Sequence, residues 1–203
     1  MEKLYTYLAL GDSYTIGEGV TITESFPYQV VETLRKNGFN FSAPEIIAKT
    51  GWTTDELSKA IDTHRFLTKY DFVTILIGVN NQYRGGTVEE YKMEFEGLLK
   101  KALQFADGKK EHVIVVSIPD YSLSPFAQTK DPENISKTID LFNSVNNALS
   151  IQYKVQHIDI STDLKNDKDH APLFVEDGLH PAANEYEKWA NETVKIITDQ
   201  LKK

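Results

Sequence analysis

Short apolar segments alternate with longer amphipathic segments along the chain. Five of the short segments are rich in β-branched and other apolar residues, which is typical of strands in a buried sheet. These predicted strands cover residues 4–10, 45–48, 72–77, 113–118 and 155–160. Segments with helical periodicity follow them, and this β-α alternation predicts a parallel sheet covered by helices on both faces.

The predicted helices have recognisable ends. They cover residues 25–37, 53–63, 87 to about 107, 134–153 and 181–203. Gly38 ends the first of them, Thr87 and Glu90 form a capping box at the start of the third, and Pro181 stands at a first-turn position of the last. We therefore expect an α/β fold, a three-layer α/β/α sandwich of the flavodoxin-like kind with a five-stranded, mainly parallel sheet.

The length of 203 residues suits one domain spanning 1–203, because no repeat, low-complexity tract or linker divides the chain. The absence of cysteine excludes a thiol nucleophile, a thiolate zinc site and disulfides. Acidic residues outnumber basic ones, 30 against 22, for a formal net charge of −8. That balance disfavours a nucleic-acid partner, which needs a basic face.

The sequence contains neither a long apolar segment nor a motif typical of metal or nucleotide binding. We expect no membrane span, and because the sequence as given shows no export signal we expect a cytoplasmic location, with secretion open if the sequence has been trimmed. The histidines show no metal-binding spacing, and no glycine-rich phosphate loop follows a strand. We therefore expect neither a metal nor another cofactor.

The turn after the first predicted strand carries a candidate nucleophile. The sequence there is Gly-Asp-Ser, residues 11–13, and Gly11 permits the sharp bend that exposes the hydroxyl of Ser13 at the sheet edge. An ordinary turn with a helix cap gives the same three residues, so this motif alone leaves both interpretations open.

A carboxylate and an imidazole stand three residues apart near the C-terminus, at Asp177 and His180. The spacing lets the carboxylate accept from Nδ1–H and leaves Nε2 free to take a hydroxyl proton. A surface turn with a capping histidine would have the same sequence pattern. Asp167 and His170 repeat the spacing, but they lie in a highly charged segment, so we favour His180.

Two loops offer hydrogen-bond donors at the same predicted edge. Gly51 follows the second strand and can present its N–H at close range, and the side-chain amide of Asn80 follows the third. Such donors stabilise the oxyanion formed in acyl transfer. Each loop alone is also an ordinary turn signal.

Taken together and in this order, the four blocks resemble the SGNH (GDSL) hydrolase family over essentially the whole chain. The resemblance implies that Ser13 is the nucleophile, that Asp177 and His180 are its partners, and that the oxyanion hole consists of the Ser13 N–H, the Gly51 N–H and the Asn80 side chain. It also implies a serine-dependent carboxylic ester hydrolase that works through an acyl-enzyme. The chain departs from the family pattern at Tyr14, where leucine is common, and at Asn81, where aspartate is usual and would support the oxyanion loop.

The substrate is predicted only as a class. Tyr14 and Trp52 are candidate substrate-binding residues, and Tyr83, Tyr121 and Phe126 fall near the same edge. We expect a small or water-soluble ester, such as a short-chain acyl ester, an acetylated sugar or a lysophospholipid. A thioesterase, a catalytically weak binding module on the same scaffold, and a metal-dependent phosphodiester or sulfate hydrolase are the alternatives. Arg84 reads as a solvated loop residue that could reach a ligand carboxylate or phosphate.

Overall fold

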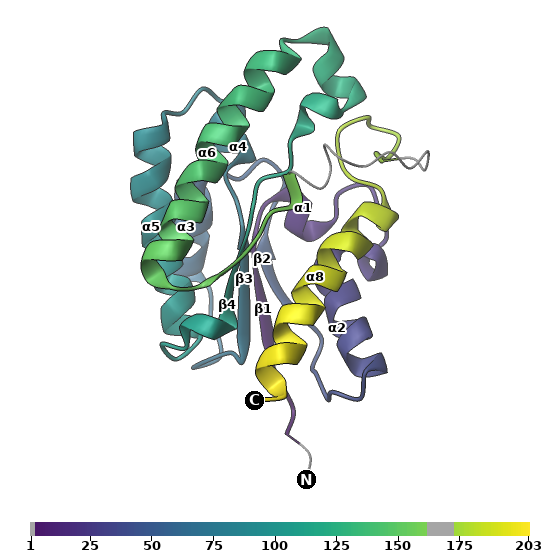
Figure 1. Ribbon diagram of the computed structural model, residues 1–203, viewed down its shortest axis with the longest axis vertical. Helices are drawn as coiled ribbons and strands as arrows, with labels where there is room; N and C mark the ends of the chain where they lie inside the picture. The colour runs from purple at the N-terminus through teal and green to yellow at the C-terminus, as the bar shows by residue number, and fades with distance from the viewer. Residues whose placement is uncertain (1–2, 162–172) are drawn as a thin grey trace.

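The computed structural model describes residues 3–161 and 173–203, with five parallel strands at its centre (Figure 1). They are β1 (Tyr7–Gly11), β2 (Glu45–Ala48), β3 (Phe72–Leu76), β4 (Val113–Val116) and β5 (Gln156–Ile158). Their order in the sheet is β2-β1-β3-β4-β5, the flavodoxin-like arrangement. All residues of β1, β3 and β4 are buried, which explains why these segments are almost entirely apolar rather than alternating, with Thr74 of β3 as the polar exception.

Helices cover both faces of the sheet. In Figure 1, α2 (Phe26–Lys36) and α8 (Ala183–Leu201) lie on one side, where they pack against each other. The other side carries α3 (Thr54–Thr63), α5 (Val88–Phe105) and α6 (Pro132–Tyr153). The predicted three-layer α/β/α sandwich is therefore confirmed.

Short helices that the periodicity did not predict occupy several loops. They are α1 (Ser13–Ile16), α4 (Val79–Tyr83) and the 3₁₀ turns η1 (Ile22–Glu24), η2 (Lys110–His112), η3 (Tyr121–Leu123) and η4 (Pro125–Thr129). Helices of three to five residues bury too few positions for a helical period to show. The prediction for Pro181 was wrong in detail: α8 begins at Ala183, and Pro181 instead forms an isolated antiparallel bridge with Phe174.

The strand register brings the predicted motifs together. Gly11 at the end of β1 is level with Ala48 of β2 and Leu76 of β3. The loops that follow these three strands therefore leave the sheet at the same height. This alignment places the turns carrying Ser13, Gly51 and Asn80 side by side, as expected for the carboxyl edge of a parallel sheet.

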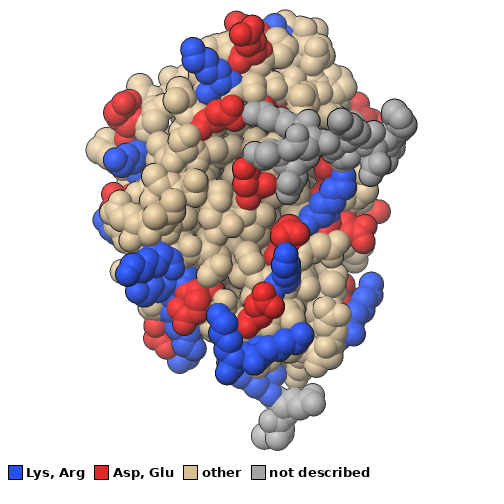
Figure 2. Space-filling model, viewed as in Figure 1, with Lys and Arg blue, Asp and Glu red and all other residues tan. Residues whose placement is uncertain are grey.

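Acidic and basic side chains are interspersed over the face shown in Figure 2. Exposed pairs of opposite charge form on the surface of the protein, such as Lys59 with Asp55 at 2.7 Å. No helix within the described ranges has the length and apolar character needed to cross a membrane.

Candidate active site

Ser13 is the first residue of α1, directly after the turn that leaves β1. Gly11 is required there, because a Cβ would collide with the carbonyl oxygen of Leu76 on the neighbouring strand and with the hydroxyl of Thr15. Asp12 caps the short helix, its Oδ1 accepting from the Tyr14 N–H at 3.0 Å. The serine is only 5% exposed, so it lies buried in the wall of a cavity rather than exposed at the sheet edge as predicted. It is thus held in a turn that the surrounding backbone fixes tightly.

His180 and Asp177 form a directly bonded pair. Nδ1 of His180 lies 2.6 Å from Oδ2 of Asp177, while Oδ1 of the same carboxylate accepts the N–H groups of Leu179 and His180 at 2.8 and 2.9 Å. Partial burial acts to raise the pKa of Asp177, but the hydrogen bonds from His180 and Leu179 outweigh it and the pKa is lowered. The carboxylate is therefore ionised at neutral pH and in hydrogen-bond contact with Nδ1 of the imidazole. The competing pair, Asp167 and His170, lies outside the described residues.

The segment around His180 is tied down on both sides. The N–H of Val175 donates to the carbonyl of His180 at 2.9 Å, and the N–H of Phe126 in η4 donates to the carbonyl of Gly178 at 2.9 Å. The ring of Tyr14 meets the imidazole edge-on, with centroids 5.7 Å apart, and also contacts Trp189 of α8. Tyr14, at a position where the family commonly has leucine, thus packs against the imidazole.

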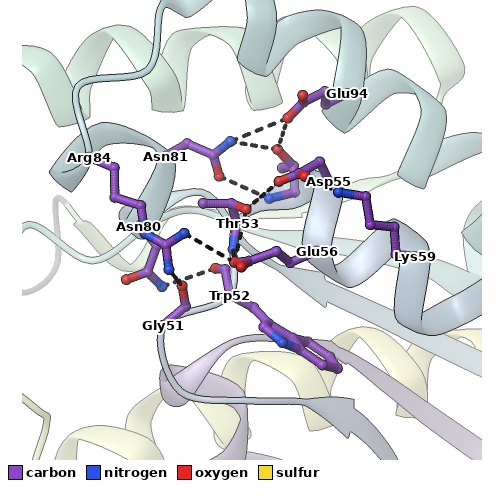
Figure 3. Close-up of polar contacts among 11 residues, drawn as sticks. Gly51, Trp52, Thr53, Asp55, Glu56, Lys59, Asn80, Asn81, Arg84 and Glu94 are labelled. Carbon is purple, nitrogen blue, oxygen red and sulfur yellow. Dashed lines mark hydrogen bonds and ion pairs between the residues drawn. The ribbon is translucent and has the colours of Figure 1, made fainter.

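One cavity of about 240 Å³ collects most of the predicted site residues. Its lining consists of Ser13, Tyr14, Thr50, Gly51, Val79, Asn80, Tyr83, Tyr121, Phe126, Leu179 and His180. Trp52 is not part of this lining in the described chain, and Figure 3 shows its indole directed away from Asn80 and Arg84. Thr50, Val79 and Leu179 also line the cavity; they were not among the predicted site residues, although each is adjacent to one of them in the sequence.

The side chain of Asn80 is bonded to the loop that carries Gly51, the other oxyanion-donor candidate. The amide Nδ2 of Asn80 donates to the main-chain oxygen of Trp52 at 3.0 Å, one residue beyond Gly51 (Figure 3). An amide nitrogen carries two hydrogens, so the second remains for a ligand in the cavity. The bond therefore fixes the orientation of Asn80 without using up its donor capacity.

Asn81 supports the same loop through an amide instead of the carboxylate expected from the family pattern. Its Oδ1 accepts from the Thr54 N–H at 3.0 Å and its Nδ2 donates to Oγ1 of Thr54 at 2.6 Å. The Thr54 hydroxyl in turn donates to Glu94 of α5, whose carboxylate lies 3.4 Å from Asn81 Nδ2. An aspartate here would face Glu94, so the amide is the better partner in this chain.

Residues 9–188 match the model of the GDSL-like lipase/acylhydrolase family. No curated protein matches the sequence significantly. Among solved structures, a lipase/acylhydrolase from Enterococcus faecalis superposes with a TM-score of 0.78 and 20% identity, covering 97% of this chain and 96% of that one. Axe2, an acetylxylan esterase from Geobacillus stearothermophilus, gives a TM-score of 0.72 at 18% identity, covering 95% and 94%. The esterase EstA from Pseudoalteromonas sp. gives 0.68 at 19%, covering 98% and 100%.

Proposed function

This chain belongs to the GDSL-like lipase/acylhydrolase family and is a carboxylic ester hydrolase, and we propose that it works through an acyl-enzyme on Ser13. The observation that carries the proposal is the cavity that Ser13 shares with His180, whose imidazole is bonded to Asp177. With Nδ1–H held by the carboxylate, Nε2 is the nitrogen available to accept a proton.

In the first half-reaction, Oγ of Ser13 attacks the ester carbonyl carbon while His180 Nε2 takes the hydroxyl proton. The carbonyl oxygen becomes an oxyanion, which the N–H groups of Ser13 and Gly51 and the side-chain amide of Asn80 stabilise. The C–O bond to the alcohol then breaks, and the imidazolium returns its proton to the departing alcohol oxygen. The acyl group remains as an ester of Ser13.

In the second half-reaction, His180 takes a proton from water as the water oxygen attacks the acyl carbon. A second oxyanion forms at the same donors and collapses, the bond to Ser13 Oγ breaks, and the serine recovers its proton from His180. The free acid leaves, and the balanced reaction is ester plus water giving acid plus alcohol. None of these steps calls for a cofactor.

The cavity indicates a small acyl or alcohol group. A volume of about 240 Å³ lies below the roughly 300–1,000 Å³ of drug-sized ligand sites. Apolar side chains from three loops line most of it, namely Val79, Tyr83, Tyr121, Phe126 and Leu179. We infer that a short-chain acyl ester is the preferred substrate, and the likeness to an acetylxylan esterase makes an acetylated sugar a second candidate.

A panel of esters tests the substrate class and the nucleophile together. We expect p-nitrophenyl acetate or butyrate to be turned over faster than long-chain esters, with acetylated sugars, a lysophospholipid and an acyl thioester as further arms. Ser13→Ala should abolish turnover and labelling by a fluorophosphonate, whereas Ser42→Ala, which changes a serine outside the cavity lining, should retain both. Equal turnover by Ser13→Ala and wild type would refute the mechanism, and ligand binding without labelling would indicate a binding module.

The choice between the two histidines has its own matched test. His180→Ala should remove nearly all ester turnover, and His170→Ala should leave most of it. The opposite result would assign the general base to His170.

A further inference from the structure

Arg84 ties together the two loops that carry the oxyanion-donor candidates. It follows α4 directly, and its N–H donates to the carbonyl of Asn80 at 3.0 Å. Its Nη2 reaches across to the carbonyl of Gly51 at 2.6 Å, and its Nη1 lies 3.3 Å from Oε2 of Glu56 (Figure 3). Arg84, predicted to be a solvated loop residue that could reach a ligand carboxylate or phosphate, thus binds groups of the protein itself.

The carbonyl that Arg84 holds belongs to a tight turn. The N–H of Trp52 donates to the carbonyl of Lys49 at 3.1 Å, which closes a four-residue turn with Gly51 in third place. The φ of Gly51 is 83°, the value typical of that position in a type II turn. The Gly51 N–H belongs to the central peptide of this turn, between Thr50 and Gly51, and Arg84 holds the carbonyl of the following peptide, so its bond restrains the turn at Gly51 from the C-terminal side.

Glu56 keeps the guanidinium in place. Its Oε2 accepts from the Thr53 N–H at 3.0 Å at the start of α3, and this bond, with further hydrogen bonds from Thr53 and Arg84, lowers the pKa of Glu56. The Arg84 and Glu56 side chains are 51% and 37% exposed, so their ion pair contributes little to stability. The contact with Glu56 therefore orients the guanidinium more than it stabilises the fold.

We propose that Arg84 is a positioning residue that holds Gly51 and Asn80 in a fixed relation. The guanidinium restrains the turn that presents the Gly51 N–H, and the Arg84 main chain bonds to the residue that presents the amide. The bond from Asn80 to the Trp52 carbonyl closes the link from the other side. This inference rests on the proposed function, because it assumes that Gly51 and Asn80 stabilise the oxyanion.

Arg84→Ala tests the inference, with Arg65→Ala as a matched control that removes an exposed arginine outside the cavity lining. Misplacing one donor should lower kcat about tenfold and leave KM within about twofold, because the oxyanion exists only along the reaction path. Arg84→Lys separates geometry from charge. It retains the positive charge but lacks the two-pronged donor, so we expect it to keep most of the defect.

Hydrogen exchange gives a readout that does not depend on turnover. In Arg84→Ala the amides of residues 50–53 should exchange faster than in wild type, while Arg65→Ala leaves them unchanged. The inference is overturned if Arg84→Ala matches Arg65→Ala in kcat, if exchange at these amides is unaltered, or if Arg84→Lys restores full activity. A wild-type protein without Ser13-dependent ester turnover would instead refute the proposed function, and the exchange experiment would still decide on the restraint of the turn.

Discussion

Nδ1 of His180 lies 2.6 Å from Oδ2 of Asp177, and the other carboxylate oxygen of Asp177 accepts two main-chain N–H groups of the same turn. Asp177→Asn can keep those two bonds through Oδ1 while placing an NH₂ group against Nδ1. The imidazole would then carry its proton on Nε2, where it cannot accept one from Ser13. We expect kcat to fall by up to about 10⁴.

Steady-state kinetics on a short-chain ester measure this loss, and thermal unfolding shows whether the turn survives. Asp199→Asn, at an exposed position of α8, provides the control. A kcat for Asp177→Asn within tenfold of wild type, with an unchanged melting temperature, would contradict the role given to this carboxylate.

Asn80 is expected to act mainly on the transition state. One hydrogen of its amide is bonded to the Trp52 carbonyl, and the other is available in the cavity. Removing an oxyanion donor typically costs about 10²–10³ in kcat, so Asn80→Ala should show that loss with little change in KM. Asn147→Ala, an exposed asparagine of α6, should have no effect. An Asn80→Ala variant that changes KM alone would place the side chain in ground-state binding instead.

Much of the fold could be predicted because its signals are local. The strand predicted over 45–48 has the observed bounds, and the capping box of Thr87 and Glu90 is present at the start of α5. Pro181 shows the limit of such signals. A proline suits the first turn of a helix and also the bridge it forms here with Phe174, and only the tertiary structure distinguishes the two.

The candidate site likewise contains residues that the sequence predicts and one that it does not. Ser13, Gly51, Asn80 and His180 could be found because each follows or borders a readable element, and the parallel sheet brings such positions to one edge. The contact of Arg84 with this site could not be predicted, because its partner Gly51 lies 33 positions earlier in the chain. A long, flexible side chain in a glycine-rich loop gives no sequence signal of where its guanidinium binds.

Restoring the family's usual residue at position 81 should destabilise this protein. Asn81→Asp keeps the acceptor for the Thr54 N–H, but it loses the donor to Thr54 Oγ1 and sets a second carboxylate beside Glu94. Because Asn81 is half-buried and Glu94 is exposed, the lost hydrogen bond and the like-charge repulsion together should cost about 1 kcal/mol of unfolding free energy. Urea denaturation at pH 7 measures the change.

The substitution Glu94→Gln tests whether repulsion between two carboxylates causes this loss. In a Glu94→Gln background the second carboxylate would meet a neutral amide, so Asn81→Asp should cost clearly less there than in wild type. Equal costs in the two backgrounds would show that Glu94 does not sense the charge at position 81.

The burial of Asp12 leads us to expect an unusual pH dependence of the free energy of unfolding. The side chain is fully buried, and its Oδ2 has no hydrogen-bond partner among the described residues. Burial raises the pKa of Asp12 to about 7, although the bond from the Tyr14 N–H acts in the opposite direction. Asp177, with its lowered pKa, has the opposite linkage, and its contribution is lost only as the pH falls below the usual aspartate range.

Between the unfolded-state pKa of about 4 and the folded-state pKa of about 7, the native protein holds a proton on Asp12 that the unfolded chain has released. Raising the pH through this window therefore lowers the free energy of unfolding, by at most about 1.4 kcal/mol per pH unit. Asp12→Asn keeps an acceptor for Tyr14 and removes the titration, so the stability of wild type relative to this variant should decline from pH 4.5 to pH 7 in urea denaturation. Parallel stability curves would show that Asp12 titrates alike in both states.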